Sequence, residues 1–138
     1  MAQVPECDLQ RDVVEYCKVS QPVAKDSWGI NKTFRHVQFD GIRFQNFQFQ
    51  FSEFRNVTFT NVVWQDSSIR ASDLSDTRFV ENEFYNLIMS ESHVYYLSFY
   101  RSQFSGGNLS RLTGERNSFF GSSLSGTKFE YLRLNRTD

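Results

Sequence analysis

Residues 34–64 read FRHVQFDGIRFQNFQFQFSEFRNVTFTNVVW and decide the fold, because an aromatic residue stands at every fifth position. Stepping by five from Phe34 gives Phe at each position to Phe59, and then Trp64. The series continues with Ile69, Leu74, Phe79, Phe84, Met89, Val94, Phe99, Phe104, Leu109, Gly114, Phe119, Leu124, Phe129 and Leu134. Gly114 is its one member that is not apolar. A second series, two residues earlier in each unit, holds small or aliphatic residues such as Val57 and Ser72.

A repeat of five residues fits neither the α-helical period of about 3.6 nor the strand period of about 2. Two inward residues separated by one outward residue indicate a short strand. The two polar residues that follow, such as Arg55 and Asn56, indicate a turn. Each unit is therefore expected to turn a corner, and successive units to stack as a solenoid.

This pattern resembles the pentapeptide-repeat proteins, whose units follow a small-polar-apolar-polar-polar order centred on Leu or Phe. The resemblance covers about residues 32–135. It implies an all-β fold, a right-handed quadrilateral β-helix with four units per coil, so that residues twenty apart stack and the repeat makes about five coils. We expect residues 1–31 to form an N-terminal cap and residues 32–138 to form the β-helix.

The N-terminal cap is expected to contain a short helix over residues 8–18. Asp8 is a favourable N-cap residue, and apolar residues follow at helical spacing at Leu9, Val13, Tyr16 and Cys17. Such a helix would shield the first coil of the solenoid. The two cysteines, Cys7 and Cys17, either pair in an oxidising compartment or remain two unconnected thiols, and the sequence leaves both alternatives open.

Gly114 marks an irregular coil. Leu112, two residues earlier, is large where the pattern prefers a small residue. We expect either an exchange of volume between these two inward positions or a β-bulge.

Composition narrows the classes of function. The chain has 138 residues and a net charge of −1, so it presents no strong overall field for nucleic acid or anionic lipid. It contains no apolar run long enough for a transmembrane helix and no signal-peptide pattern at residues 1–10. We therefore expect no membrane span and no nucleic-acid partner. The compartment stays open between the cytoplasm of a bacterium and a secretory lumen or the cell exterior.

We expect no enzymatic activity, cofactor, metal or small-molecule substrate. Two cysteines and two distant histidines cannot supply four convergent zinc ligands. Glu53, Asp73 and His93 should share one outward column, but a flat wall offers no pocket to exclude water from a reaction. No phosphate-binding loop or nucleophile motif occurs in the sequence.

A protein-binding surface is the better-supported expectation. Val80, Tyr100 and Phe120 should follow one another on successive coils at an outward position, with Tyr95 and Tyr96 at the adjoining corner and Tyr85 on the next face. Grouped exposed aromatic residues are typical of binding hot spots. The alternative is that Phe120 packs under a loop or the C-terminal tail. Phe51 also lies outside the core series.

Two more specific functions follow from resemblance. Some pentapeptide-repeat proteins resemble a DNA duplex and bind DNA gyrase or topoisomerase, as in quinolone resistance; the near-zero net charge here contradicts such mimicry. Residues 54–59, FRNVTF, also resemble units in the luminal domain of the synaptic vesicle glycoprotein 2 family, which is glycosylated. Four N-glycosylation sequons would suit that location, at Asn31, Asn56, Asn108 and Asn135.

The function expected from the sequence is therefore a non-enzymatic protein–protein interaction module. Its partner is a protein of unknown identity, and self-association is a second option. The gyrase-binding protein and the glycosylated luminal or extracellular recognition domain remain alternatives.

Overall fold

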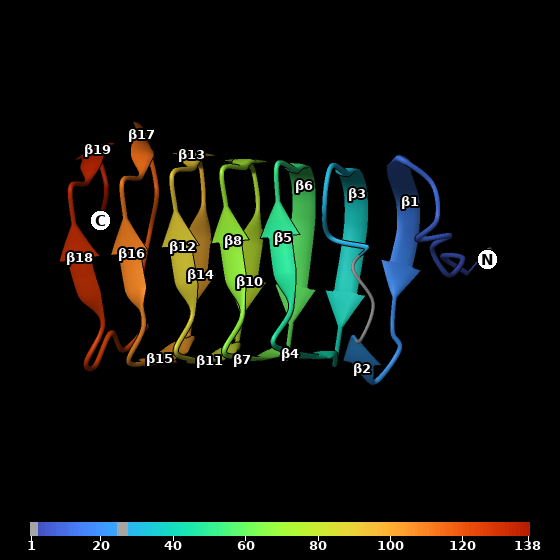
Figure 1. Cartoon of the computed structure of the whole chain (residues 1–138), viewed down its shortest axis with the longest axis horizontal. Coiled ribbons are helices and arrows are strands. Elements are labelled where there is room, and N and C mark those ends of the chain that lie inside the picture. The colour runs from blue at the N-terminus through green and yellow to red at the C-terminus, as the bar shows by residue number, and fades with distance from the viewer. Residues whose placement is uncertain (1–2, 25–27) are drawn as a thin grey trace.

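The protein is a parallel β-solenoid of about six turns, as seen in a computed structural model that describes residues 3–24 and 28–138. Figure 1 shows the strands of successive coils side by side along the long axis, from β1 near the N-terminus to β18 and β19 near the C-terminus. The described residues form nineteen strands in three sheets and contain no helix. The all-β solenoid predicted from the five-residue repeat is thus confirmed at this level.

The largest sheet has nine strands. Its main path runs through β1 (Val13–Val19), β3 (Thr33–Asp40), β6 (Glu53–Thr60), β9 (Asp73–Ser75), β13 (His93–Tyr95), β17 (Thr113–Glu115) and β19 (Arg133–Asn135). It branches at β6 into β10 (Arg78–Val80) and β14 (Ser98–Tyr100). The long strands β1, β3 and β6 therefore each contribute to two rows of strands.

The other two sheets have five strands each. One contains β2 (Val23–Ala24), β4 (Arg43–Gln45), β7 (Val63–Gln65), β11 (Glu83–Tyr85) and β15 (Gln103–Ser105). The other contains β5 (Gln48–Gln50), β8 (Ser68–Arg70), β12 (Ile88–Ser90), β16 (Asn108–Ser110) and β18 (Lys128–Glu130).

Residues twenty apart in the sequence are paired in register. Phe34 pairs with Phe54, Phe59 with Phe79, and Phe84 with Phe104. Each five-residue unit ends at a corner in the left-handed region of φ, as at Asn56 (φ 54°) and Asp76 (φ 48°). Asn and Asp tolerate this conformation better than most residues, which explains their frequency at the corners.

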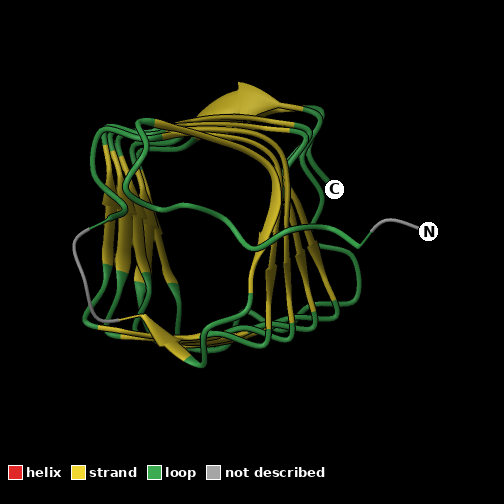
Figure 2. Cartoon of the chain, turned by 90° about the vertical axis from the view of Figure 1, so that its right-hand side faces the viewer, coloured by secondary structure: helices red, strands yellow, loops and turns green. Residues whose placement is uncertain are grey.

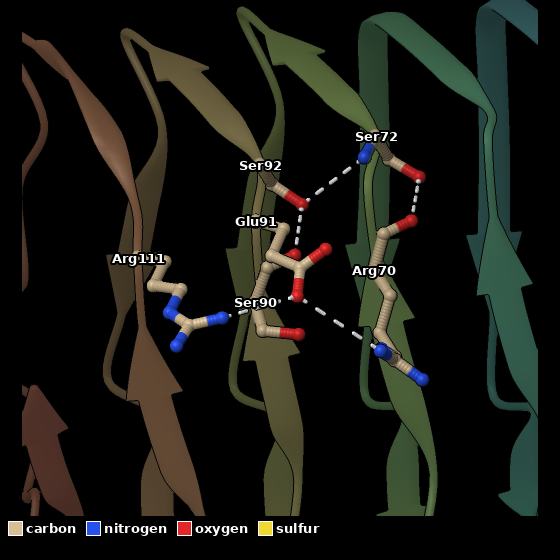
Figure 3. A network of polar contacts seen from close by, with 6 residues as sticks. All are labelled: Arg70, Ser72, Ser90, Glu91, Ser92 and Arg111. Carbon is tan, nitrogen blue, oxygen red and sulfur yellow. Dashed lines mark hydrogen bonds and ion pairs between the residues drawn. The ribbon is translucent and has the colours of Figure 1, made fainter. Parts of the chain in front are cut away.

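The core consists of rings stacked along the solenoid axis. The Phe59, Phe79 and Phe99 rings lie nearly parallel, with centroids 4.8 and 4.7 Å apart. The second inward position carries serines whose hydroxyls form hydrogen bonds with the backbone of the preceding coil. In Figure 3 the Ser92 hydroxyl accepts a hydrogen bond from the Ser72 backbone N–H at 3.1 Å and donates one to the Ser90 carbonyl at 2.9 Å. These polar positions are buried without leaving that backbone group unpaired.

The expected N-terminal helix is wrong. Residues 13–19 form strand β1, which pairs with β3 in the same twenty-residue register, so Val13 lies opposite Thr33. Val14 and Val19 are buried at the phase of the five-residue series, and Cys17 occupies a second inward position. β-branched valines suit a strand better than a helix. This extra coil accounts for the difference between the expected five turns and the six observed.

The N-terminal end is closed by a disulfide, a lysine side chain and a buried tryptophan instead of a helix. Cys7 and Cys17 form a disulfide that holds the segment before β1 against this coil. The Lys32 side-chain amine donates hydrogen bonds to the backbone carbonyls of Leu9 at 2.8 Å and Arg11 at 2.6 Å. Trp28 is buried against the first core rings and lies 4.6 Å from Phe47 between centroids. Figure 2, which looks onto this end, shows the N-terminal segment crossing in front of the stacked strands.

The C-terminal coil is less regular and less covered. Residues 118–127 contribute only isolated bridges at Ser118 and Ser123, and Phe129 remains 43% exposed although it continues the inward series.

Gly114 keeps its register between Val94 and Leu134, so no residue is inserted there. Leu112 is buried, as the exchange of volume between the two inward positions predicts.

Candidate interaction surface

Val80, Tyr100 and Phe120 form one row on the surface, which we call the aromatic ridge; Phe120 is exposed, whereas Val80 and Tyr100 are half-buried. Each follows a residue of the inward series by one position. Val80 and Tyr100 end strands β10 and β14, where alternation directs them outward, and Phe120 takes the same place in the next, less regular coil. Val80 pairs with Tyr100 across β10 and β14. The rings of Tyr100 and Phe120 stack with centroids 6.0 Å apart and planes inclined by 11°. Phe120 is 70% exposed, so the described chain does not cover it with a loop or tail.

A surface depression of about 830 Å³ adjoins the ridge. It is lined by Val80 and Tyr100 together with Tyr96, Arg78 and Arg116 among others. Two arginines lie over tyrosine rings: the guanidinium of Arg101 is 5.0 Å from the Tyr100 centroid, and that of Arg116 is 5.8 Å from the Tyr96 centroid. Such cation–π contacts restrict ring motion at an exposed site.

The other two tyrosines of the predicted patch lie elsewhere. Tyr95 is on β13, between Ser75 and Glu115 of the neighbouring strands, and it lines a separate depression with His93. Tyr85 is on β11 in a different sheet. The structure therefore brings together Val80, Tyr96, Tyr100 and Phe120 and separates them from Tyr85 and Tyr95.

Tyr85 makes its own polar contact. Its hydroxyl donates a hydrogen bond to the Glu83 carboxylate at 3.0 Å. This hydrogen bond, together with the negative charge of Glu83, raises the pKa of the Tyr85 phenol, and the positive charge of Arg43 opposes the shift.

The column of Glu53, Asp73 and His93 is present as expected. These residues pair directly across β6, β9 and β13, and a shallow depression of about 330 Å³ lies over them. The His93 ring contacts the Thr113 hydroxyl of the next coil. Within residues 3–24 and 28–138, no three His, Cys, Asp or Glu side chains converge as metal ligands.

A third depression, of about 710 Å³, lies over the sheet of β5, β8, β12, β16 and β18, and sequence reasoning missed it. Figure 3 shows Glu91 between two arginines, 4.0 Å from Arg70 and 3.7 Å from Arg111. All three side chains are about half exposed or more, so these ion pairs add little stability. The twenty-residue spacing in the sequence could have revealed this ion pair, because Glu91 and Arg111 occupy the same corner of successive coils.

The four sequon asparagines lie in different surroundings. Asn31 and Asn135 are exposed, and Asn56 is exposed with its amide nitrogen 2.6 Å from the His36 Nδ1. Asn108 is partly buried, and its side-chain carbonyl is buried without a hydrogen-bond partner among the described residues.

Comparison with known proteins adds no relative: no protein family matches the sequence, and no curated protein is significantly similar to it. In the described ranges, no helix is long and apolar enough to cross a membrane.

Proposed function

We propose that the protein is a non-enzymatic protein–protein interaction module that binds its partner through the aromatic ridge and the adjoining depression. The observation that carries this proposal is the stack of Tyr100 on Phe120, which leaves a large apolar ring 70% exposed on the surface. Burying exposed aromatic rings contributes strongly to association, and Tyr is enriched among residues that dominate binding energy. Isolated exposed rings need no such explanation, but a paired set does.

The proposal includes a finer description of the fold: a right-handed quadrilateral β-helix of the pentapeptide-repeat type. Support comes from the five-residue spacing of buried residues such as Phe34, Phe39, Phe44 and Phe49, and from the register of twenty residues per coil. A stack of hydrogen-bonded coils is a rigid support. Side chains fixed on such a support lose little conformational freedom on binding, so more of the contact energy is retained.

The charges around the ridge indicate what its partner presents. Arg78 and Arg116 line the depression with one acidic residue, Asp76, and Arg101 lies against Tyr100, so cationic groups outnumber anionic ones. A partner surface with an apolar centre and acidic residues at its margin would complement these groups. A duplex nucleic acid would be a poor partner, since the net charge of the whole chain is −1.

Site-specific cross-linking tests this proposal while the partner is still unidentified. A photo-reactive phenylalanine analogue is placed at Phe120 and, in a matched control, at Tyr131, which is 77% exposed but lies outside the ridge. We expect one discrete adduct from position 120 in source cells, identified by mass spectrometry as another protein or a second copy. Equal, diffuse labelling from both positions would contradict the proposal.

A second candidate is a glycosylated luminal or extracellular recognition domain. The observation that favours it is the disulfide between Cys7 and Cys17, because such bonds persist in oxidising compartments. Expression in a secretory eukaryotic cell, followed by glycosidase digestion, tests it: an unshifted gel band would remove this candidate. Gyrase binding has no comparable structural support, and a supercoiling assay would test it directly.

A further inference from the structure

Asn31 and Phe51 occupy the same corner of two successive coils. Both have φ in the left-handed region, at 55° and 54°, and both side chains are exposed. The Asn31 backbone N–H donates to the Gln50 carbonyl at 2.9 Å, and Ile30 forms a parallel bridge with Gln50. The two corners are therefore one coil apart, a strand spacing of about 4.8 Å. Asn31 and Phe51 line one surface depression.

The Phe51 side chain is exposed beside Asn31. Its ring lies outside the inward series and outside the aromatic ridge, and it is 58% exposed. On the far side from Asn31, the same corner carries the small residue Ala71, which lines the same depression. The depression that Asn31 and Phe51 share, of about 390 Å³, leaves space beside the ring for a sugar attached at Asn31.

Asn31 begins the sequon Asn31-Lys32-Thr33. We propose that Asn31 carries an N-linked glycan and that the apolar C–H face of its first sugar packs on the Phe51 ring. The electron-rich face of an aromatic ring attracts such polarised C–H groups. In the transfer, the Asn31 amide nitrogen loses one proton and bonds to the anomeric carbon of the sugar. The bond from that carbon to a lipid-linked pyrophosphate donor breaks, and the pyrophosphate leaves.

The surroundings distinguish Asn31 from the other sequons. The Asn108 side-chain carbonyl is buried. The Asn56 amide already contacts His36, and Asn135 lies beside Glu115 on the neighbouring strand. The Cys7–Cys17 disulfide lies at the same end of the solenoid as Asn31, and such bonds persist in oxidising compartments, of which the lumen where sequons are modified is one. This inference rests on the second candidate function, the glycosylated luminal or extracellular domain, and does not depend on the aromatic ridge.

Occupancy at Asn31 is tested in protein secreted from eukaryotic cells. Thr33→Ala removes the acceptor sequence, whereas Thr33→Ser keeps it and is the matched control. We expect mass spectrometry after enzymatic deglycosylation in ¹⁸O water to show label at Asn31 in the wild type and in Thr33→Ser, with complete loss in Thr33→Ala. An unmodified Asn31 in folded, secreted wild-type protein would overturn the proposal.

Packing on Phe51 is tested separately, with Asn56, Asn108 and Asn135 each changed to Gln. The thermal midpoint of the Thr33→Ser protein, trimmed to one sugar, is compared with that of Thr33→Ala. We expect the glycosylated form to melt at the higher temperature when Phe51 is present, and this difference to disappear when Phe51→Ser is added to both proteins. An equal difference with and without Phe51 would refute the packing.

Discussion

The indole N–H of Trp64 donates a hydrogen bond to the side-chain carbonyl of Asn82 at 2.9 Å, and both residues are fully buried. The Asn82 amide in turn donates to the backbone carbonyls of Phe59 at 2.8 Å and Val80 at 2.9 Å. The Asn82 side chain thus provides hydrogen-bond partners for the indole N–H of Trp64, the largest ring of the core, and for two backbone carbonyls. Later coils carry Ser102 and Ser122 at the equivalent position, where no tryptophan lies beneath.

This relationship predicts a strong coupling between the two residues. Asn82→Ser leaves the buried Trp64 N–H unpaired and should lower the free energy of unfolding by about 1 to 3 kcal/mol. Adding Trp64→Phe removes the unpaired donor, so the double variant should be more stable than the sum of the two single changes predicts. Urea denaturation of the four proteins measures the coupling. Strict additivity would show that the hydrogen bond does not form.

Phe79 tests the ring stack itself. It is fully buried between Phe59 and Phe99, so Phe79→Ala should cost about 3 to 5 kcal/mol through lost burial and the cavity left behind. Phe51→Ala is the control, because that ring is largely exposed and unglycosylated protein should lose little stability. A loss below about 1 kcal/mol for Phe79→Ala, read from denaturant midpoints, would contradict the core assignment.

Stability should be much more sensitive to an added methyl group at Gly114 than at Gly41. A Cβ at Gly114 would lie 1.7 Å from the Val94 carbonyl oxygen, whereas one at Gly41 would meet nothing within 4 Å. Gly114→Ala should therefore destabilise the protein by about 2 to 5 kcal/mol, through steric overlap added to an unfavourable φ. Gly41→Ala should cost only about 1 kcal/mol for its left-handed backbone. Thermal unfolding compares the two, and equal losses would argue against the close contact at Val94.

The Tyr85–Glu83 contact predicts the direction of a pKa change. Because the phenol donates to a carboxylate, its neutral form is stabilised and the pKa of Tyr85 is raised. Glu83→Gln removes the negative charge and should lower the pKa of Tyr85 toward the ordinary value. Titration of ¹³C-labelled tyrosine by NMR measures it, with Glu81→Gln as a control on the neighbouring corner. An unchanged Tyr85 pKa in Glu83→Gln would mean that the hydrogen bond is not maintained in solution.

The core could be predicted from sequence because one spacing rule governs it. Phe34, Trp64 and Phe99 are buried where the five-residue step places them, and strand pairing keeps the twenty-residue register. The N-terminal coil was not predicted, because its inward residues are small. Val14 and Val19 fit the five-residue step, but Gly29 stands at a position of the series where a ring is expected. Trp28, one position earlier, is the buried aromatic residue of this coil. Apolar residues at positions 9, 13, 16 and 17 fit a helix equally well.

The candidate site was predicted only in part, for a physical reason. Column spacing places Val80, Tyr100 and Phe120 in one row, and the structure keeps that row. Corner residues are harder to assign from spacing, because a left-handed corner directs the chain onto a new face. Tyr96 accordingly lines the depression beside the ridge, while its neighbour Tyr95 lies on another row of strands.

The affinity of the cross-linked partner for ridge variants tests the central claim most directly. Tyr100→Ser with Phe120→Ser removes both stacked rings from a surface position, so folding stability should change little while binding weakens by at least about tenfold. Tyr131→Ser, outside the ridge, is the matched control and should bind as the wild type does. Isothermal titration calorimetry with the folded variants gives the result. Undiminished affinity in the Tyr100→Ser, Phe120→Ser variant would contradict the proposed function.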